Sequence, residues 1–140
     1  MNEDNARGNA AIVEAIREHG LSLGVDHIPY VAAEIIYQIE KEGTLFVASK
    51  EVNKPGEERE LSFFFLKNLK ECWSIGYTSR EECELDHCKE YAEISWQELF
   101  RRILDDPLIT GLILNPSGAR YPIPQELMKD ILEIVKSQNA

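Results

Sequence analysis

The sequence predicts a single α/β (α+β) domain over residues 1–140, with one mixed β-sheet of about five strands flanked by helices on its faces. Three observations lead to this prediction. The length of 140 residues and the hydrophobic content of 44% are ordinary for one soluble domain. Several short runs are rich in β-branched and aromatic residues, as strands are. Between those runs, apolar residues recur at helical spacing. We therefore expect a helical pair over residues 9–43 and a sheet-and-helix body over residues 44–138.

The helical pair is predicted from two apolar stripes that each end at a glycine. The first stripe indicates a helix over residues 9–19, which Gly20 would stop in a left-handed conformation. The second helix is expected to start near Asp26, to tolerate Pro29 in its first turn, and to run to Gly43.

Five apolar segments predict the strands of the sheet. They cover residues 44–49, 61–66, 71–77, 91–94 and 109–115. The segment 61–66 is apolar on both faces, so we expect it near the centre of the sheet. In the segment 71–77 the large residues Trp73, Ile75 and Tyr77 alternate with small ones, so this strand should bury its aromatic face. Gly111 indicates a bulge or a close backbone approach.

Two capping boxes predict helix starts from local chemistry, at residues 78–81 (TSRE) and 95–98 (SWQE). In each box the first hydroxyl, of Thr78 or Ser95, would accept a hydrogen bond from a first-turn amide. The glutamate would reach back to the amide of the capping residue. Pro124 is expected to open a terminal helix.

The charge of the chain narrows the classes of partner. With 25 acidic and 15 basic residues, the formal net charge is −10. A surface this negative repels phosphate backbones and anionic membranes, so we expect no nucleic acid and no membrane as partner. No apolar run approaches the roughly 18 residues that span a bilayer, and the N-terminus is polar and acidic, so a cytoplasmic protein is expected. Acidity that only keeps the domain soluble is the alternative explanation.

The three cysteines, Cys72, Cys83 and Cys88, are an odd number without a secretory signal, so we predict reduced thiols. If Cys83 and His87 lay on one helix they would share a face, which hints at zinc or thiol chemistry. A structural zinc site needs four ligands, and the paired Cys-x-x-Cys spacing is missing. We therefore predict no cofactor, no metal and no catalytic residue. A thiol- or metal-dependent enzyme using Cys83, His87 and Cys88 is the alternative.

Four motifs from Leu45 onward follow one another in the order of a known family. They are LSFFFLKN, WSIGYTSREE, ISWQELFRRIL and GLILNPSGARYPIPQELMKDIL. In this order they resemble the N-terminal domain of the SseB (enhanced serine sensitivity) family. The resemblance implies an α/β body and suggests a non-enzymatic role in protein interaction. In this family the domain occurs alone or precedes a C-terminal domain, and we expect this chain to correspond to the first domain. Some small acidic domains of this general kind are immunity partners of toxins, which adds an immunity-like role to the expectations.

An acidic stretch after the third predicted strand is the first candidate for a binding surface. We predict that Glu81, Glu82 and Glu84 steer a basic protein partner, and that Trp73 and Tyr77 supply aromatic anchors beside them. A solvated helix flank explains the same acidic residues without a partner.

The segment TGLILNPSGARYPIP is the second candidate. The Asn115 side chain would bond backbone amides two residues on, Pro116 would fix φ, and Gly118 would take a positive φ. A turn does not explain Arg120 and Tyr121, so we predict that these two residues, with Asn115, contact a partner. The sequence thus predicts a non-enzymatic, cytosolic protein-interaction module, with a structural homodimer as a further alternative.

Overall fold

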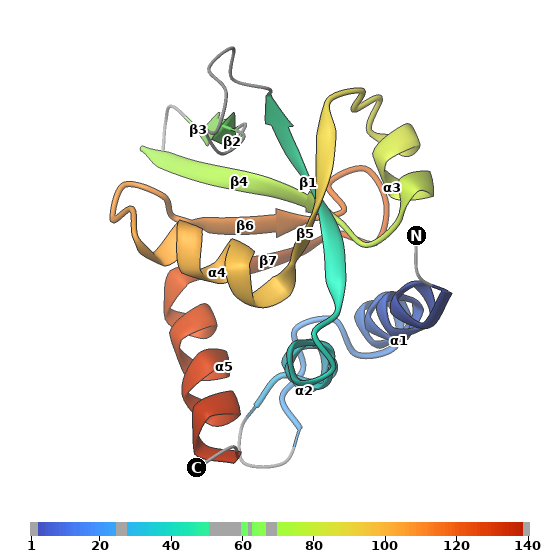
Figure 1. The fold of residues 1–140 in the computed structure, drawn as a ribbon, viewed down its shortest axis with the longest axis vertical. Helices are drawn as coiled ribbons and strands as arrows, with labels where there is room; N and C mark the ends of the chain where they lie inside the picture. The colour runs from blue at the N-terminus through green and yellow to red at the C-terminus, as the bar shows by residue number, and fades with distance from the viewer. Residues whose placement is uncertain (1–2, 25–27, 51–59, 62, 67–69, 139–140) are drawn as a thin grey trace.

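The computed structural model of the chain describes residues 3–24, 28–50, 60–61, 63–66 and 70–138 (Figure 1). The described residues form five helices: α1 (Glu3–His19), α2 (Tyr30–Glu40), α3 (Arg80–Leu85), α4 (Trp96–Leu104) and α5 (Gln125–Gln138). They form seven strands: β1 (Thr44–Lys50), β2 (Glu60–Leu61), β3 (Phe63–Leu66), β4 (Glu71–Tyr77), β5 (Tyr91–Ser95), β6 (Gly111–Leu114) and β7 (Tyr121–Pro124). Among the described helices, none combines the length and the apolar character needed to cross a bilayer.

The strands form one mixed sheet in which β4 pairs with three other strands, β1, β3 and β6. The main path of the sheet runs β2-β1-β4-β6-β7, while β3 pairs with β4 and β5 pairs with β1. Strand β4 is antiparallel to β1 and β3 but parallel to β6, with Ile75 opposite Ile113. A parallel pair needs a crossover connection, and here α3, β5 and α4 supply it. The mixed sheet expected from the sequence is confirmed.

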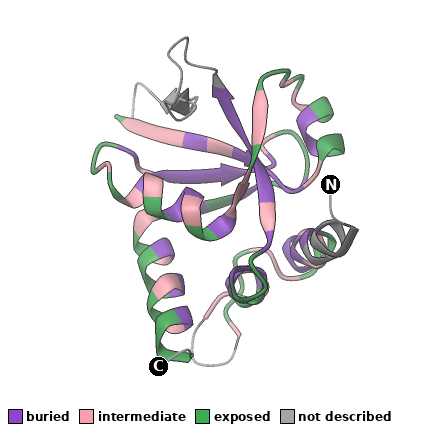
Figure 2. Cartoon of the chain, in the orientation of Figure 1, coloured by how far each residue is buried: buried purple, intermediate pink, exposed green. Residues whose placement is uncertain are grey.

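Helices cover both faces of the sheet, but unequally. Leu45 and Val47 of β1 belong to the main core, which they share with α1, α2, α4 and α5. Phe46 lies between them in β1 and therefore points to the opposite face, where it clusters with Tyr77 of β4 and Cys83 of α3. Figure 2 shows buried residues along β1 and β6 and along the inner sides of the helices. The predicted placement of helices on the faces of the sheet is confirmed.

All five predicted strand segments contain strands, with two differences. The segment 61–66 contributes to both β2 and β3, with position 62 outside the described residues. Within the described part of the chain β3 pairs with β4 alone, off the main path, so its expected central place is wrong. Strand β7 was not predicted, and it pairs with β6. Gly111 makes the expected close approach, because a Cβ there would overlap the Ile123 carbonyl oxygen and Pro124 Cα.

The two N-terminal helices pack against each other as predicted, but both helix starts are corrected, and α1 begins at Glu3 rather than at Asn9. Gly20 follows α1 with a φ of 53°, the expected left-handed stop. Helix α2 begins at Tyr30 rather than near Asp26, which lies outside the described residues. The reason is that Pro29, at φ −57° and ψ 141°, is extended and forms a β-bridge with Leu23. Pro29 is therefore the capping residue instead of a first-turn residue.

A buried polar junction joins five elements at one end of the sheet. The Asn9 amide Nδ2 donates to the backbone oxygens of Thr44, at 2.8 Å, and Thr78, at 3.0 Å. Trp96 Nε1 donates to Asn9 Oδ1 at 3.3 Å. The Thr78 N–H donates to Asn115 Oδ1 at 2.9 Å, and Asn115 Nδ2 donates to the Thr78 hydroxyl at 3.0 Å. These bonds fasten α1 to the starts of β1 and α4, and to the chain just after β4 and β6.

Candidate functional site: a groove between helices α1 and α3

Helix α3 starts one residue later than its capping box predicts. Ser79 is the N-cap, and its hydroxyl accepts a hydrogen bond from the Glu82 N–H at 3.3 Å. The prediction that Thr78 caps this helix is wrong, because the N–H and the hydroxyl of Thr78 are hydrogen-bonded to the Asn115 side chain in the buried junction. In the second box the predicted cap is confirmed, since the Ser95 hydroxyl accepts from a first-turn amide of α4 at 3.1 Å, but the Glu98 carboxylate accepts from Arg101 Nε at 3.0 Å rather than bending back to the Ser95 N–H.

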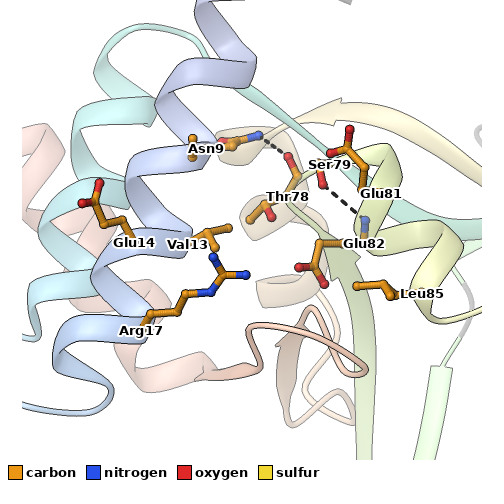
Figure 3. A pocket seen from close by; sticks show the side chains of 10 residues that line it. Asn9, Val13, Glu14, Arg17, Thr78, Ser79, Glu81, Glu82 and Leu85 are labelled. Carbon is orange, nitrogen blue, oxygen red and sulfur yellow. Dashed lines mark hydrogen bonds between the residues drawn. The ribbon is translucent and has the colours of Figure 1, made fainter.

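A groove of about 710 Å³ lies between α1 and α3 (Figure 3). Its lining residues are Asn9, Ala10, Val13, Glu14, Arg17, Thr78, Ser79, Glu81, Glu82 and Leu85. Asn9 and Thr78 belong to the buried junction, so the inner end of the groove is held by hydrogen bonds. Leu85 lines the groove although 57% of it is exposed. The groove thus combines a fixed polar end with exposed apolar surface.

The described side chains that line the groove carry a net negative charge. Glu14 on α1 and Glu81 and Glu82 on α3 are acidic, and Arg17 on α1 is the one basic residue in this lining. Glu14, Arg17 and Glu81 are exposed, whereas Glu82 is only 7% exposed. Because the carboxylates lie on both walls, the electrostatic potential of the groove favours a cation.

Glu82 lies against the loop that follows β6. A Cβ at Gly118 would overlap the Glu82 carboxylate, so the absence of a side chain at Gly118 makes room for it. The expected positive φ at Gly118 is wrong, because among the described glycines a positive φ occurs at Gly20. In this loop Asn115 has the left-handed conformation, with a φ of 51°. Its side chain bonds Thr78 instead of the amides of its own turn.

A second, smaller feature lies on the other side of α3. The Tyr77 hydroxyl donates to Asp86 Oδ2 and the Ser117 hydroxyl donates to Asp86 Oδ1, each at 2.5 Å. Burial raises the pKa of Tyr77, and the hydrogen bond to Asp86 raises it further. A hollow of about 250 Å³ adjoins this cluster, with Arg120 and Pro116 on its rim. The hollow places Arg120 on the side of the sheet that carries the smaller core.

The structure divides the predicted partner-binding residues into three groups. Glu81, Glu84 and Arg120 are exposed, and Trp73 is half-buried. Three more are core residues with exposed fractions of 1%, 0% and 2%, namely Tyr77, Asn115 and Tyr121. These three are not surface anchors, because the Tyr77 and Tyr121 rings pack in the two cores and Asn115 holds the junction. Glu82 forms a third group, since it is buried yet lines the groove.

The cysteine and histidine cluster does not have the helical geometry expected of it. Helix α3 ends at Leu85 and His87 has a left-handed φ of 54°, so Cys83 and His87 do not share a helix face. Cys83 is fully buried, and burial, with a smaller contribution from Cys88, raises the pKa of its thiol to about 12. Cys88 is half-buried, and its thiol donates to the Glu90 carbonyl at 3.4 Å. Within the described ranges, no group of three or more His, Cys, Asp or Glu residues could hold a metal ion.

The sequence reasoning missed the contribution of α1 to the site. Asn9, Val13 and Arg17 line the groove, although α1 was expected only to dock by an apolar stripe. One signal was present, because Asn9 stands three residues before Ile12 and four before Val13, on the face that the stripe buries. A polar residue on an apolar face indicates a buried hydrogen-bonding role.

Comparison with known proteins finds no matching family model, no matching curated protein and no matching solved structure. The resemblance of the motifs to the SseB family therefore stays a prediction.

Proposed function

We propose that this protein is a non-enzymatic, cytosolic interaction module of SseB type that binds a basic protein partner in the groove between α1 and α3. The observation that supports this proposal is the lining of the groove. Glu14 lines the groove from α1 and Glu81 lines it from α3, and the apolar side chains of Val13 and Leu85 line it as well. A lysine- or arginine-rich segment with apolar side chains matches both features, since its charge meets carboxylates while its carbon chains cover the apolar surface.

The charge of the whole chain supports the same class of partner. A net charge of −10 accelerates the encounter with a basic protein and makes the association weaken as salt is added. The cysteine cluster supports an enzyme less well, because the Cys83 thiol is buried and its raised pKa keeps it protonated near neutral pH.

The proposal is tested by affinity capture from extract of the native cells at low salt. The variant Glu14→Lys/Glu81→Lys reverses one charge on each wall of the groove and should capture much less of the basic partner than the unchanged protein. The matched control Glu126→Lys/Glu133→Lys reverses two exposed charges on α5 and alters the net charge equally. Capture that survives the groove variant, or that both variants reduce to the same extent, contradicts a partner site in the groove.

A further inference from the structure

The Glu82 carboxylate is the least expected group in the groove. The residue is 7% exposed, and its Oε2 atom is buried without a hydrogen-bond partner among the described residues. Burying a carboxylate is strongly unfavourable unless a donor or a cation compensates it. Most buried polar atoms in folded proteins have such a partner. Glu82 therefore indicates a ligand group that supplies the compensation.

Helix capping does not account for this carboxylate. In a capping box the acidic side chain three residues after the cap bends back to the N–H of the capping residue. Here the backbone N–H of Glu82 bonds the Ser79 hydroxyl, while the Glu82 carboxylate lies against Gly118. Figure 3 shows this carboxylate directed into the space between α3 and α1. The Glu82 side chain therefore lines the groove from the α3 wall while its carboxylate packs on the loop after β6.

Arg17 is the nearest candidate for an internal partner. It lines the opposite wall, and Figure 3 shows its guanidinium extending across the groove toward α3. No ion pair joins Arg17 to any carboxylate of the described residues, and the side chain is exposed. A long, exposed arginine can reach the inner end of the groove by changing rotamer.

We infer that Glu82 binds a single cationic side-chain group, the guanidinium of an arginine or the ammonium of a lysine, and that Arg17 competes with it for the same carboxylate. This inference rests on the proposed function, because the cation belongs to the basic partner. The apolar side chains of Val13 and Leu85 would contact the carbon chain of the incoming residue. Arg17 would compensate the carboxylate only after a change of rotamer, because no ion pair joins the two residues in this structure.

The inference is tested by titrating the ¹⁵N-labelled full chain with small amides and following its amide resonances by NMR. The probes are the amides of N-acetyl-arginine and N-acetyl-lysine, and the neutral control is the amide of N-acetyl-citrulline. The cationic probes should shift the amide signals of Val13, Ser79 and Gly118 saturably, whereas the citrulline probe should not. The stronger of the two cationic probes identifies guanidinium or ammonium as the preferred group.

Three variants assign the binding to Glu82. Glu82→Gln should lower the affinity for the preferred probe about tenfold or more, because a charge-assisted hydrogen bond is lost. Glu84→Gln removes an exposed charge of the same helix that does not line the groove, and should change the affinity less than about twofold. Arg17→Gln should tighten binding, because it removes the competitor.

Several outcomes would overturn the inference. If the citrulline probe binds as tightly as the arginine probe, the charge of the probe plays no part in binding. If Glu82→Gln and Glu84→Gln weaken binding equally, the attraction comes from the overall negative charge and not from Glu82. Should Glu82→Gln not fold, the Arg17→Gln variant and the citrulline control still test the inference, because unchanged or weaker binding in Arg17→Gln excludes competition.

The capture experiment separates this inference from the proposed function. Partner capture that depends on Glu14 and Glu81 but does not change in Glu82→Gln refutes this inference alone. Probe binding at Glu82 without any captured partner refutes the proposed function instead.

Discussion

Asn115 offers the sharpest test of how the end of the sheet is held together. It follows β6, it is fully buried, and its φ of 51° lies in the left-handed region that few residues tolerate. Its side chain accepts from the Thr78 N–H at 2.9 Å and donates to the Thr78 hydroxyl at 3.0 Å. The substitution Asn115→Ala removes both hydrogen bonds and keeps the left-handed backbone.

The expected loss follows from two contributions. Leaving the buried Thr78 N–H without its acceptor costs about 1–3 kcal/mol. Holding alanine in the left-handed region costs roughly another 1–2 kcal/mol. Asn115→Ala should therefore lower the free energy of unfolding by about 2–5 kcal/mol, out of the roughly 5–15 kcal/mol typical of a domain. Asn115→Gly also loses the hydrogen bonds but adopts positive φ freely, so it should be about 1 kcal/mol more stable than Asn115→Ala.

Equilibrium unfolding in urea measures both variants against the unchanged protein, and an unchanged slope shows that the comparison is between similar folded and unfolded states. The reasoning fails if Asn115→Ala loses less than about 1 kcal/mol, since a buried unsatisfied N–H costs at least that much. The part that concerns backbone strain fails separately if the glycine variant is no more stable than the alanine variant.

Two further predictions concern the groove and the smaller core. Gly118→Ala should lower stability by about 0.5–1.5 kcal/mol, because the new Cβ would push the flexible end of the Glu82 side chain off its rotamer, and Gly118→Ala/Glu82→Ala should recover part of this loss in the same urea assay. An alanine variant as stable as the unchanged protein would show that the carboxylate moves aside at no cost. The second prediction concerns Cys83, because burial raises the pKa of its thiol to about 12. Above about pH 9 the thiol of the unfolded chain loses its proton, whereas the thiol of the folded chain keeps it. The free energy of unfolding should therefore fall as pH rises, by up to about 1.4 kcal/mol per pH unit. Unfolding at about pH 8 and about pH 10 should show a smaller decline for Cys83→Ala, and equal declines would contradict this assignment.

Where local chemistry is decisive, the sequence predicted the structure well. Ser95 caps α4 and Gly20 stops α1 as expected, because each role depends on a side chain and backbone within a few residues. The predicted strand segments appear because alternating or continuous apolar residues must be buried on one or both faces.

Where two neighbouring residues could serve the same local role, tertiary contacts determined which of them does so. Thr78 and Ser79 are both suitable caps for α3, and the choice went to Ser79 because Asn115, far along the chain, bonds Thr78. The contact between Asn115 and Thr78 also explains why the predicted backbone conformation of the loop after β6 was wrong. The positive φ was expected at Gly118, but it occurs at Asn115, and Gly118 instead gives space to Glu82.

By itself the sequence determined the class of fold, the acidic character and most helix and strand segments, since these depend on composition and on contacts between residues close in the chain. The groove was decided by the tertiary structure alone, because its walls come from residues 9–17 and 78–85, which only the packing of α1 beside α3 brings together. Of the three glutamates expected on one surface, Glu82 is buried, whereas Glu81 and Glu84 are exposed. The physical reason is that the Glu82 carboxylate packs against Gly118, a residue of the loop after β6 that is distant in the sequence.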